Sequence, residues 1–370
     1  MKIDIITLHA VKNYGSVLQA FATKKLFESY GHQVKIINYV KEESKEENLL
    51  QFWAGNNIIK KIVMLPTIKR WKKVFGEFCI KELEVSRERY TTAEDFQNYQ
   101  LEADLYCTGS DQVWNSKWNN GILPELYLSF VPNTKYKFAF AASFGQERLT
   151  ETEVMETKPY IEQYRFISVR EDSARRIIEE QYGYRPCTHL LDPTLCLDQY
   201  SWRRYAKKTQ NKEEYILIYN LNRSAEFDNY AKELSKRTGL KLKRLCMRYD
   251  QVLRCGKSII IPEIFEFISL IDNAKFVLTD SFHATAFSMN MNTQPICIYP
   301  NEFGGRIDSF LRMTDTLQCH VRNYSDFDVV DRTVDFKKVN LVLEAERKKA
   351  KNFLESVFLD YEKETEEKRR

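Results

Sequence analysis

Apolar residues near the start of the chain follow the two-residue period of a strand and then the period of a helix. Residues 2–8 (KIDIITL) fit a buried strand, a polar turn follows at 12–16, and apolar residues then recur at helical spacing up to Gly31. Residues 34–40 (VKIINYV) fit the next strand. Strand, helix and strand together have the length of one right-handed βαβ unit, which predicts a parallel sheet.

The same alternation continues along most of the chain. In the first half, further strands are expected at 105–108, 137–142 and 166–169. A second set of strands is expected at 215–219, 240–246, 275–278 and 295–299, with helices between them. Two consecutive sets predict an α/β fold with two Rossmann-like domains that face one another across a cleft. In such folds the ligand lies at the carboxyl ends of the strands.

The domain boundaries follow from this alternation. We expect an N-terminal domain over 1–190, a C-terminal domain over 191–335, and a final helix within 336–370 that packs back on the first domain. Residues 41–90 interrupt the N-terminal alternation with an insert of basic and apolar residues. One interpretation of the insert is a pair of surface helices that cover a sheet edge. The other is a peripheral contact of residues 58–73 with an anionic membrane surface.

Composition excludes several classes of protein. The formal net charge of the 370 residues is only +4, too small for a dedicated nucleic-acid binder, so no nucleic-acid partner is expected. No apolar run approaches the ~20 residues that cross a bilayer, and the first residues do not form a signal peptide. The eight cysteines are scattered, as is typical of buried thiols in a reducing compartment. We therefore expect a cytoplasmic protein.

Two motif classes are absent from the sequence. None of the five histidines lies in an HxH or HExxH pattern, so no metal site is expected. The chain also lacks GxxxxGK[ST], which excludes a P-loop nucleoside triphosphatase.

Candidate binding residues lie where the predicted strands give way to helices. The first such turn carries Asn13, Gly15 and Ser16, and its glycine allows a ligand to approach the backbone closely. The amides that follow lie at the positive end of a helix dipole, which favours an anion. A capped turn without a ligand is the alternative interpretation.

Two further turns of the N-terminal domain carry polar side chains. Gly109, Ser110 and Asp111 offer a small residue, a hydroxyl and a carboxylate, although either polar residue can also cap the next helix. Arg170 ends a strand that is otherwise fit for burial. We expect its guanidinium to bind an anion, and pairing with a carboxylate is the alternative.

The C-terminal domain carries two more candidate turns. Asp280 and Ser281 end a strand, and His283 lies in the first turn of the following helix. A phosphorylated ligand bound there would favour the protonated imidazole and make it a proton donor. In residues 303–308, two glycines before Arg306 allow a loop to bring the guanidinium onto a phosphate or carboxylate, and a structural ion pair is the alternative.

Six motifs give these turns a family context. NYGSVLQAFA, GSDQVWN, FAASFG, SVRED, LDPTLCL and TDSFHATAFSM occur in this order between residues 13 and 289. Over about residues 3–312 the chain resembles the polysaccharide pyruvyl transferase family. The resemblance implies a GT-B-like fold and transfer of pyruvate from phosphoenolpyruvate to sugar hydroxyls. The product would be a ketal on a cell-surface polysaccharide, such as an exopolysaccharide or capsule, or on its lipid- or nucleotide-linked precursor. Phosphoenolpyruvate would be the donor substrate, and no cofactor is implied.

The resemblance also implies roles for single residues. His283 matches the histidine of an Arg-Leu-His motif in relatives and is the expected general acid. Ser281 stands where that motif has arginine, so one anion contact must come from elsewhere or be absent. Arg306 matches a lysine of relatives and Arg170 matches an arginine, so both are expected to hold the phosphoenolpyruvate.

Several alternatives stay open at this point. Asp280 and Asp111 are both candidates for the base, and the glycan acceptor could be lipid-linked, which would place the protein at the inner face of the membrane. A glycosyltransferase that uses a nucleotide sugar would share the fold, but residues 221–224 lack the Gly-rich diphosphate-binding loop that it predicts. A non-catalytic scaffold that binds a phosphorylated ligand is the third possibility, because Ser281 replaces the arginine of the family.

Overall fold

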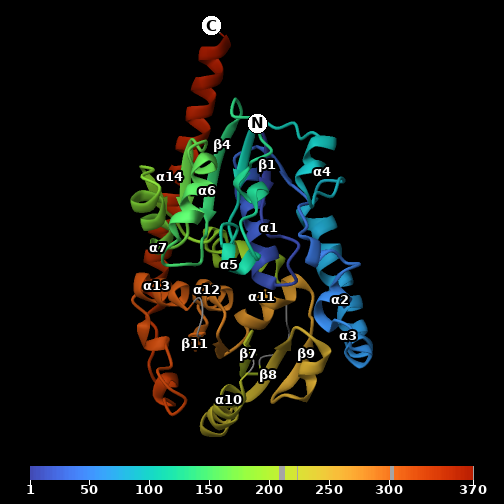
Figure 1. Ribbon diagram of the computed structural model, residues 1–370. Helices are drawn as coiled ribbons and strands as arrows, with labels where there is room; N and C mark the ends of the chain where they lie inside the picture. The colour runs from blue at the N-terminus through green and yellow to red at the C-terminus, as the bar shows by residue number, and fades with distance from the viewer. Residues whose placement is uncertain (208–212, 223, 301–303, 370) are drawn as a thin grey trace. The chain divides into compact units, whose positions relative to one another are not determined.

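The chain divides into two compact units, each built around its own sheet (Figure 1). The structure is a computed structural model that describes residues 1–207, 213–222, 224–300 and 304–369. Unit 1 consists of Met1–Glu42, Cys79–Cys196 and Glu344–Arg370. Unit 2 consists of Glu43–Phe78 and Leu197–Leu343.

Unit 1 contains a six-stranded sheet in which every pair is parallel. The strand order is β2-β1-β3-β4-β5-β6. The strands are β1 (Lys2–Ile6), β2 (Gln33–Ile36), β3 (Leu105–Thr108), β4 (Tyr136–Ala142), β5 (Phe166–Val169) and β6 (Cys187–His189). Helix α1 (Tyr14–Glu28) connects β1 to β2. β3 and β4 are buried along their whole length, which is why they appear as continuous apolar runs in the sequence.

Unit 2 contains a five-stranded parallel sheet of order β11-β10-β7-β8-β9. Its strands are β7 (Tyr215–Tyr219), β8 (Lys241–Cys246), β9 (Lys257–Ile260), β10 (Phe276–Thr279) and β11 (Gln294–Cys297). Its helices include α10 (Ala225–Thr238), α11 (Ile264–Asp272), α12 (Phe282–Asn290) and α13 (Gly305–Met313). Gly239 follows the last residue of α10, and its φ of 71° favours glycine. The two parallel sheets confirm the predicted α/β class with two Rossmann-like parts.

The insert contributes two helices, α2 (Leu49–Ala54) and α3 (Ile58–Trp71), to unit 2. The sequence placed the whole of 41–90 in the N-terminal domain, and the structure corrects this for Glu43–Phe78. The physical reason is a set of contacts along the inner side of α3. The Trp71 indole N–H donates to the Met247 carbonyl oxygen at 2.9 Å.

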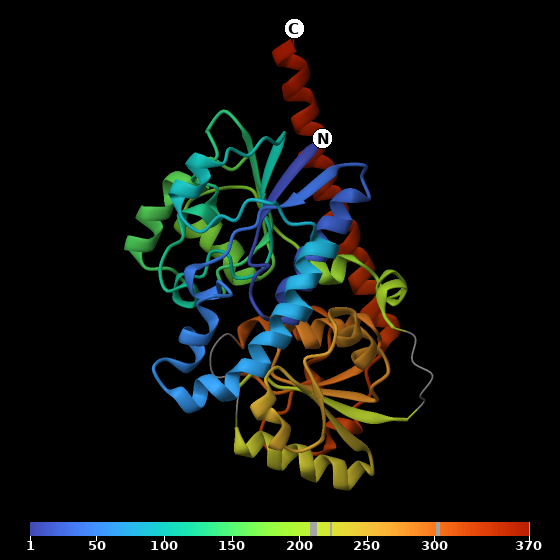
Figure 2. The same ribbon diagram turned by 90° about the vertical axis from the view of Figure 1, so that its right-hand side faces the viewer.

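The C-terminal helix α14 (Phe336–Arg369) is continuous, and its part from Glu344 onward belongs to unit 1 (Figure 2, red). The Phe358 ring lies 4.3 Å from the His32 ring and 6.1 Å from the Phe27 ring on α1. The Asp360 carboxylate accepts a hydrogen bond from the Tyr136 hydroxyl at 2.9 Å, which fastens the helix to the start of β4. The helix occupies nearly the whole of the expected range 336–370.

The carboxyl group of Asp4 lies in the middle of β1, and only 5% of the residue is exposed. Burial raises its pKa to about 6, although Lys35 and Lys2 act in the opposite direction. The folded state therefore keeps a proton that the unfolded chain releases near its ordinary value of 3.8, and stability falls as the pH rises through this window.

We expect Asp4→Asn to raise the free energy of unfolding by about 1–3 kcal/mol at neutral pH and to have little effect at about pH 4. Urea unfolding of both proteins between these pH values measures the difference. A stability difference that is the same at every pH would contradict the assignment to Asp4.

Candidate functional site

Sequence motifs that are far apart in the chain meet at the carboxyl edge of the unit 1 sheet. β3 ends at Thr108, and Asp111 forms a bridge with Ala142 at the end of β4. The Arg170 backbone N–H, directly after β5, donates to the Ala142 carbonyl oxygen at 3.1 Å. Because all strands are parallel, the polar residues that follow them collect at this edge.

Arg170 lies at the centre of a buried cluster of ion pairs. Its Nη1 lies 2.6 Å from Asp192 Oδ2 and 3.4 Å from the Ser110 hydroxyl, and its Nη2 lies 3.1 Å from Asp111 Oδ1. Its Nε lies 3.7 Å from Glu171 Oε2, and the side chain is 1% exposed. Burial disfavours the charge, but Asp192, Asp111 and Glu171 outweigh it and raise the pKa of the guanidinium. These contacts match the carboxylate-paired alternative and correct the expectation of a guanidinium held ready for an anion.

Asp111 is held in place by three hydrogen-bond donors. The Ser16 hydroxyl donates to Oδ2 at 2.6 Å, and Arg170 Nη2 and the Gln112 N–H donate to Oδ1 at 3.1 and 2.9 Å. The backbone of Asp111 has φ 74°, a conformation that costs a non-glycine residue energy and that clusters at functional sites. The structure thus brings Ser16, Asp111 and Arg170 together at the carboxyl edge of the unit 1 sheet.

The remaining candidates of unit 1 have local structural roles. The Asn13 side chain accepts a hydrogen bond from the Gly15 N–H at 2.8 Å and caps α1, which is the capped-turn alternative. A Cβ at Gly109 would lie 3.1 Å from Ile5 Cγ2 and 3.2 Å from Thr7 Cβ. The small residue is therefore needed where the chain leaving β3 passes β1.

Glu171 and Asp192 belong to this cluster and were missed as site residues. Glu171 Oε1 accepts hydrogen bonds from the Ser143 hydroxyl at 2.6 Å and from the Gly145 N–H at 3.0 Å. A Cβ on Gly145, which has φ 60°, would overlap the Gln112 side chain. The available signal was that both carboxylates lie inside quoted motifs, SVRED and LDPTLCL.

In unit 2, Asp280 organises the segment that follows β7. Its carboxylate accepts hydrogen bonds from the Leu221 N–H at 2.7 Å, the Asn222 N–H at 2.8 Å and the Asn220 amide at 2.9 Å. Burial raises its pKa, and these hydrogen bonds act in the opposite direction. Both oxygens are occupied, which suits a positioning residue better than a base. Within 221–224, position 223 lies outside the described residues.

His283 and Arg306 are brought to the same aromatic ring. Ser281 caps α12 through its hydroxyl, and His283 follows in the first turn with 7% exposure. The His283 ring lies 5.4 Å from the Phe282 ring, and the Arg306 guanidinium carbon lies 5.7 Å from that ring. Phe303, which begins the glycine-containing loop, lies outside the described residues. His283 in the first turn of α12, and the guanidinium of α13 that reaches the neighbouring Phe282 ring, are groups that can hold an anion and supply a proton.

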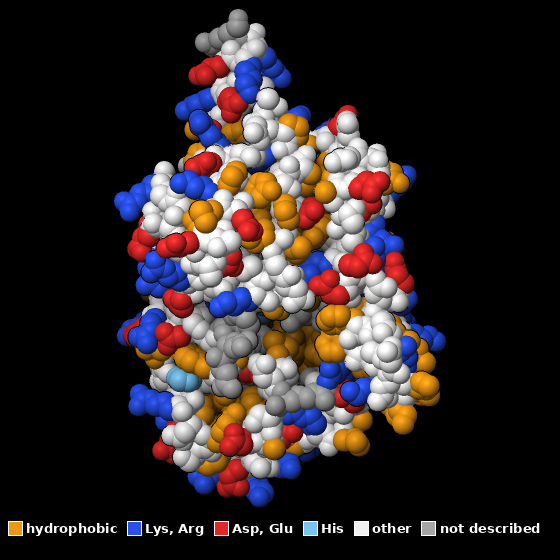
Figure 3. Space-filling view, viewed as in Figure 1, with side chains coloured by type: hydrophobic (Ala, Val, Ile, Leu, Met, Phe, Trp, Pro, Cys, Tyr) orange, Lys and Arg blue, Asp and Glu red, His pale blue; other side chains and the backbone are white. Residues whose placement is uncertain are grey.

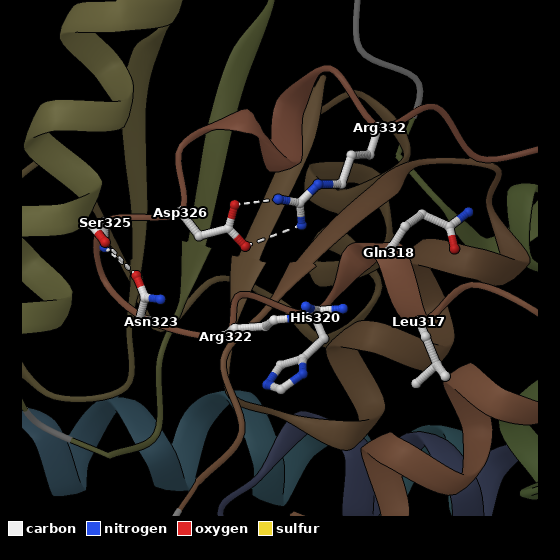
Figure 4. Close-up of a pocket in the computed structure, with 8 residues that line it drawn as sticks. All are labelled: Leu317, Gln318, His320, Arg322, Asn323, Ser325, Asp326 and Arg332. Atoms are coloured by element: carbon white, nitrogen blue, oxygen red, sulfur yellow. Dashed lines mark hydrogen bonds and ion pairs between the residues drawn. The ribbon is translucent and has the colours of Figure 1, made fainter.

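A polar pocket of about 650 Å³ lies elsewhere in unit 2 (Figure 4). It is lined by Leu317, Gln318, His320, Arg322, Asn323, Ser325, Asp326 and Arg332. Arg332 donates to Asp326 at 3.0 Å, and the His320 ring stacks on Tyr299 at 3.6 Å. None of the residues singled out from the sequence appears in this lining.

The described part of the chain shows neither a metal site nor a membrane-spanning helix. Within it, no group of three or more His, Cys, Asp or Glu residues is arranged to hold a metal ion. The same residues include no helix with the length and apolar character needed to span a membrane.

The two parallel sheets, with polar turns at their carboxyl edges, define an α/β protein of the GT-B-like class. Similar solved structures include UDP-N-acetylglucosamine 2-epimerase from Rickettsia bellii, with a TM-score of 0.52 and 12% identity over 97% of each chain. Another is the S. aureus MnaA–UDP co-structure, with a TM-score of 0.51 and 8% identity over 92% of this chain and 90% of that chain. At these identities the likeness concerns the fold alone.

The sequence itself identifies the family. The profile of the polysaccharide pyruvyl transferases matches residues 13–302, which is well over half of the chain. The protein therefore belongs to the polysaccharide pyruvyl transferase family, as its motifs predicted, and is a transferase. A search of curated proteins finds no match.

Proposed function

We propose that the protein transfers pyruvate from phosphoenolpyruvate to two hydroxyls of a sugar and so forms a cyclic ketal. The acceptor would be a cell-surface polysaccharide or its lipid- or nucleotide-linked precursor. The observation that carries the proposal is the position of His283 in the first turn of α12, with the Arg306 guanidinium carbon 5.7 Å from the adjacent Phe282 ring, in a chain of this family. Because the donor is a cytoplasmic metabolite, we infer a cytoplasmic enzyme.

The donor carries a phosphate and a carboxylate, and Arg306 is the cation that we assign to them. His283 donates its proton to the methylene carbon of phosphoenolpyruvate, which leaves an oxocarbenium-like centre at the carbon that bears the phosphate. One sugar hydroxyl attacks this carbon and gives its proton to a carboxylate, and phosphate then leaves with its bonding electron pair and takes up that proton. The second hydroxyl closes the ketal, and its proton restores the acid.

A carboxylate is needed to accept a hydroxyl proton, and Asp111 is the better candidate. Its Oδ2 already accepts a hydrogen bond from the Ser16 hydroxyl at 2.6 Å, which is the type of contact that a sugar hydroxyl would make. The donors to Asp280 include the backbone N–H groups of Leu221 and Asn222, whereas the donor to Asp111 Oδ2 is a side-chain hydroxyl, whose place a sugar hydroxyl can take. Arg170 orients Asp111 in this scheme and does not contact the donor.

The test is an assay with phosphoenolpyruvate and pyruvate-free acceptors, including a soluble glycan, a lipid-linked sugar and a nucleotide sugar. We expect release of inorganic phosphate, together with an acceptor whose mass has increased by one pyruvyl ketal. Turnover of a nucleotide sugar without any binding of phosphoenolpyruvate would instead support the glycosyltransferase alternative and contradict the proposal.

Arg306→Ala is expected to weaken phosphoenolpyruvate binding about 30-fold, since a charge-assisted contact worth about 2 kcal/mol is lost. Arg306→Lys should retain most of the affinity because it keeps the charge. Arg312→Ala is the matched control, because Arg312 lies on the same helix but is exposed and paired with Asp308 at 2.6 Å. Isothermal titration calorimetry measures the dissociation constants. A value for Arg306→Ala within about threefold of wild type would remove this residue from the site.

A further inference from the structure

The outer side of α2 and α3 exposes large apolar side chains, and we call this surface the α2–α3 face. Its α3 members are Ile58, Ile59, Ile62, Val63 and Leu65, which are between 47% and 75% exposed. Phe52 on α2 is 56% exposed. A contiguous apolar surface of this kind on a globular protein marks an interaction site.

The orientation of α3 is fixed by contacts on its other side. Thr67 Oγ1 accepts a hydrogen bond from the Tyr249 N–H at 3.1 Å, and the Trp71 indole donates to the Met247 carbonyl oxygen. Ile68 is buried on the same side. The buried and the exposed residues of α3 occupy different positions of the helical period, so they lie on opposite sides of the helix. Because the buried side is held by these contacts, the isoleucines point outward.

The charge of the α2–α3 face has one sign. Residues 49–73 contain five lysines and one arginine but no Asp or Glu. Arg70 pairs with Glu263 at 3.0 Å and Lys72 pairs with Glu46 at 3.3 Å. The other four lysines, Lys60, Lys61, Lys69 and Lys73, form no ion pair with a described residue. Figure 3 shows apolar and basic side chains intermixed at the right-hand border, where α3 lies.

We propose that the α2–α3 face binds the surface of a membrane that contains anionic lipid. The isoleucines would enter the boundary between headgroups and acyl chains, and the lysines would contact lipid phosphates. A second copy of the chain is a poorer occupant, because the same positive charge would be brought against itself. The inference does not rest on the proposed function, since neither phosphoenolpyruvate nor a glycan takes part in the binding.

The test is flotation of the full-length protein with two kinds of vesicle, phosphatidylcholine alone and an equimolar mixture with phosphatidylglycerol. We expect binding to the mixed vesicles that is about tenfold stronger than to phosphatidylcholine and that weakens with salt. The triple variant Ile58→Ser, Ile59→Ser, Ile62→Ser and the double variant Lys60→Glu, Lys61→Glu should each lose about tenfold or more.

The matched control replaces three exposed apolar residues elsewhere, Met155→Ser, Leu253→Ser and Leu341→Ser, which are 68%, 94% and 68% exposed. This variant should float like wild type, and thermal unfolding checks that all variants are folded. Equal flotation with both vesicles, no flotation, or wild-type binding by the Ile triple variant would overturn the proposal. The proposal would also be overturned if sedimentation velocity showed a dimer that the Ile triple variant abolishes and the control variant does not. The α2–α3 face would then be a protein interface. If pyruvyl transfer fails while flotation succeeds, only the proposed function is lost.

Discussion

Replacing His283 with alanine is expected to lower the rate of pyruvyl transfer by about 10²–10⁴-fold, the usual loss when a general acid is removed. His283 lies in the first turn of α12, is 7% exposed and shares the Phe282 ring with Arg306. Protonation of the methylene carbon is the step without which no sugar hydroxyl can attack. Steady-state phosphate release at saturating phosphoenolpyruvate measures kcat, and calorimetry measures donor binding separately.

A second variant separates proton transfer from simple anion binding. His283→Gln keeps a hydrogen-bond donor but cannot transfer a proton near neutral pH, so its kcat should be nearly as low as that of the alanine variant. His320→Ala, which removes another partly buried histidine of unit 2, is the control and should retain kcat within about twofold. If His283→Gln retains kcat and only donor binding weakens, His283 is a phosphate ligand and the acid is another group.

Four of the strands that the sequence predicted, β3, β4, β7 and β10, are buried along their whole length and have continuous apolar runs. β6 and β9 were not predicted, and both lie at sheet edges. β6 has three residues and β9 has four, beginning at the exposed Lys257. A short strand with polar positions has no distinctive period, because only one neighbour and part of one face shape its sequence. Parallel pairing to an existing sheet, which is a tertiary effect, decides its conformation.

The insert shows a second limit of prediction from the sequence, which concerns the unit to which a helix belongs. Its helices could be predicted from their apolar and basic residues, but their unit could not. α3 belongs to unit 2 because Trp71 reaches the Met247 carbonyl oxygen, 176 positions later in the chain. No local pattern carries information about a partner at that distance in sequence.

The turns that carry the candidate residues could be located from the sequence, but the partners of their side chains could not. The turns that follow parallel strands identified Ser16, Asp111 and Arg170, and the structure brings these three together. The sequence could not show that Asp192 and Glu171 join them, since pairing depends on which strands become neighbours. A lone arginine at a strand end therefore appeared available for a ligand, while in the fold three carboxylates surround it.

This difference makes Arg170→Ala a test of stability. We expect the substitution to lower the free energy of unfolding by about 3–5 kcal/mol, because Asp111, Glu171 and Asp192 would remain buried without their cation. Urea unfolding at neutral pH measures the loss. Arg175→Ala is the control, since Arg175 is 43% exposed and its pair with Asp172 should contribute less than about 1 kcal/mol.

The pH dependence of the Arg170→Ala variant identifies the cause of its instability. Without the guanidinium, the buried carboxyl groups hold protons more tightly in the folded than in the unfolded state, so lowering the pH stabilises the folded variant. Its deficit relative to wild type should therefore shrink from neutral pH towards about pH 5, and Arg170→Ala combined with Asp192→Asn should recover part of the loss at neutral pH. If Arg170→Ala unfolds like wild type and only phosphoenolpyruvate binding weakens, the arginine is a ligand of the donor, and the buried cluster does not depend on its charge.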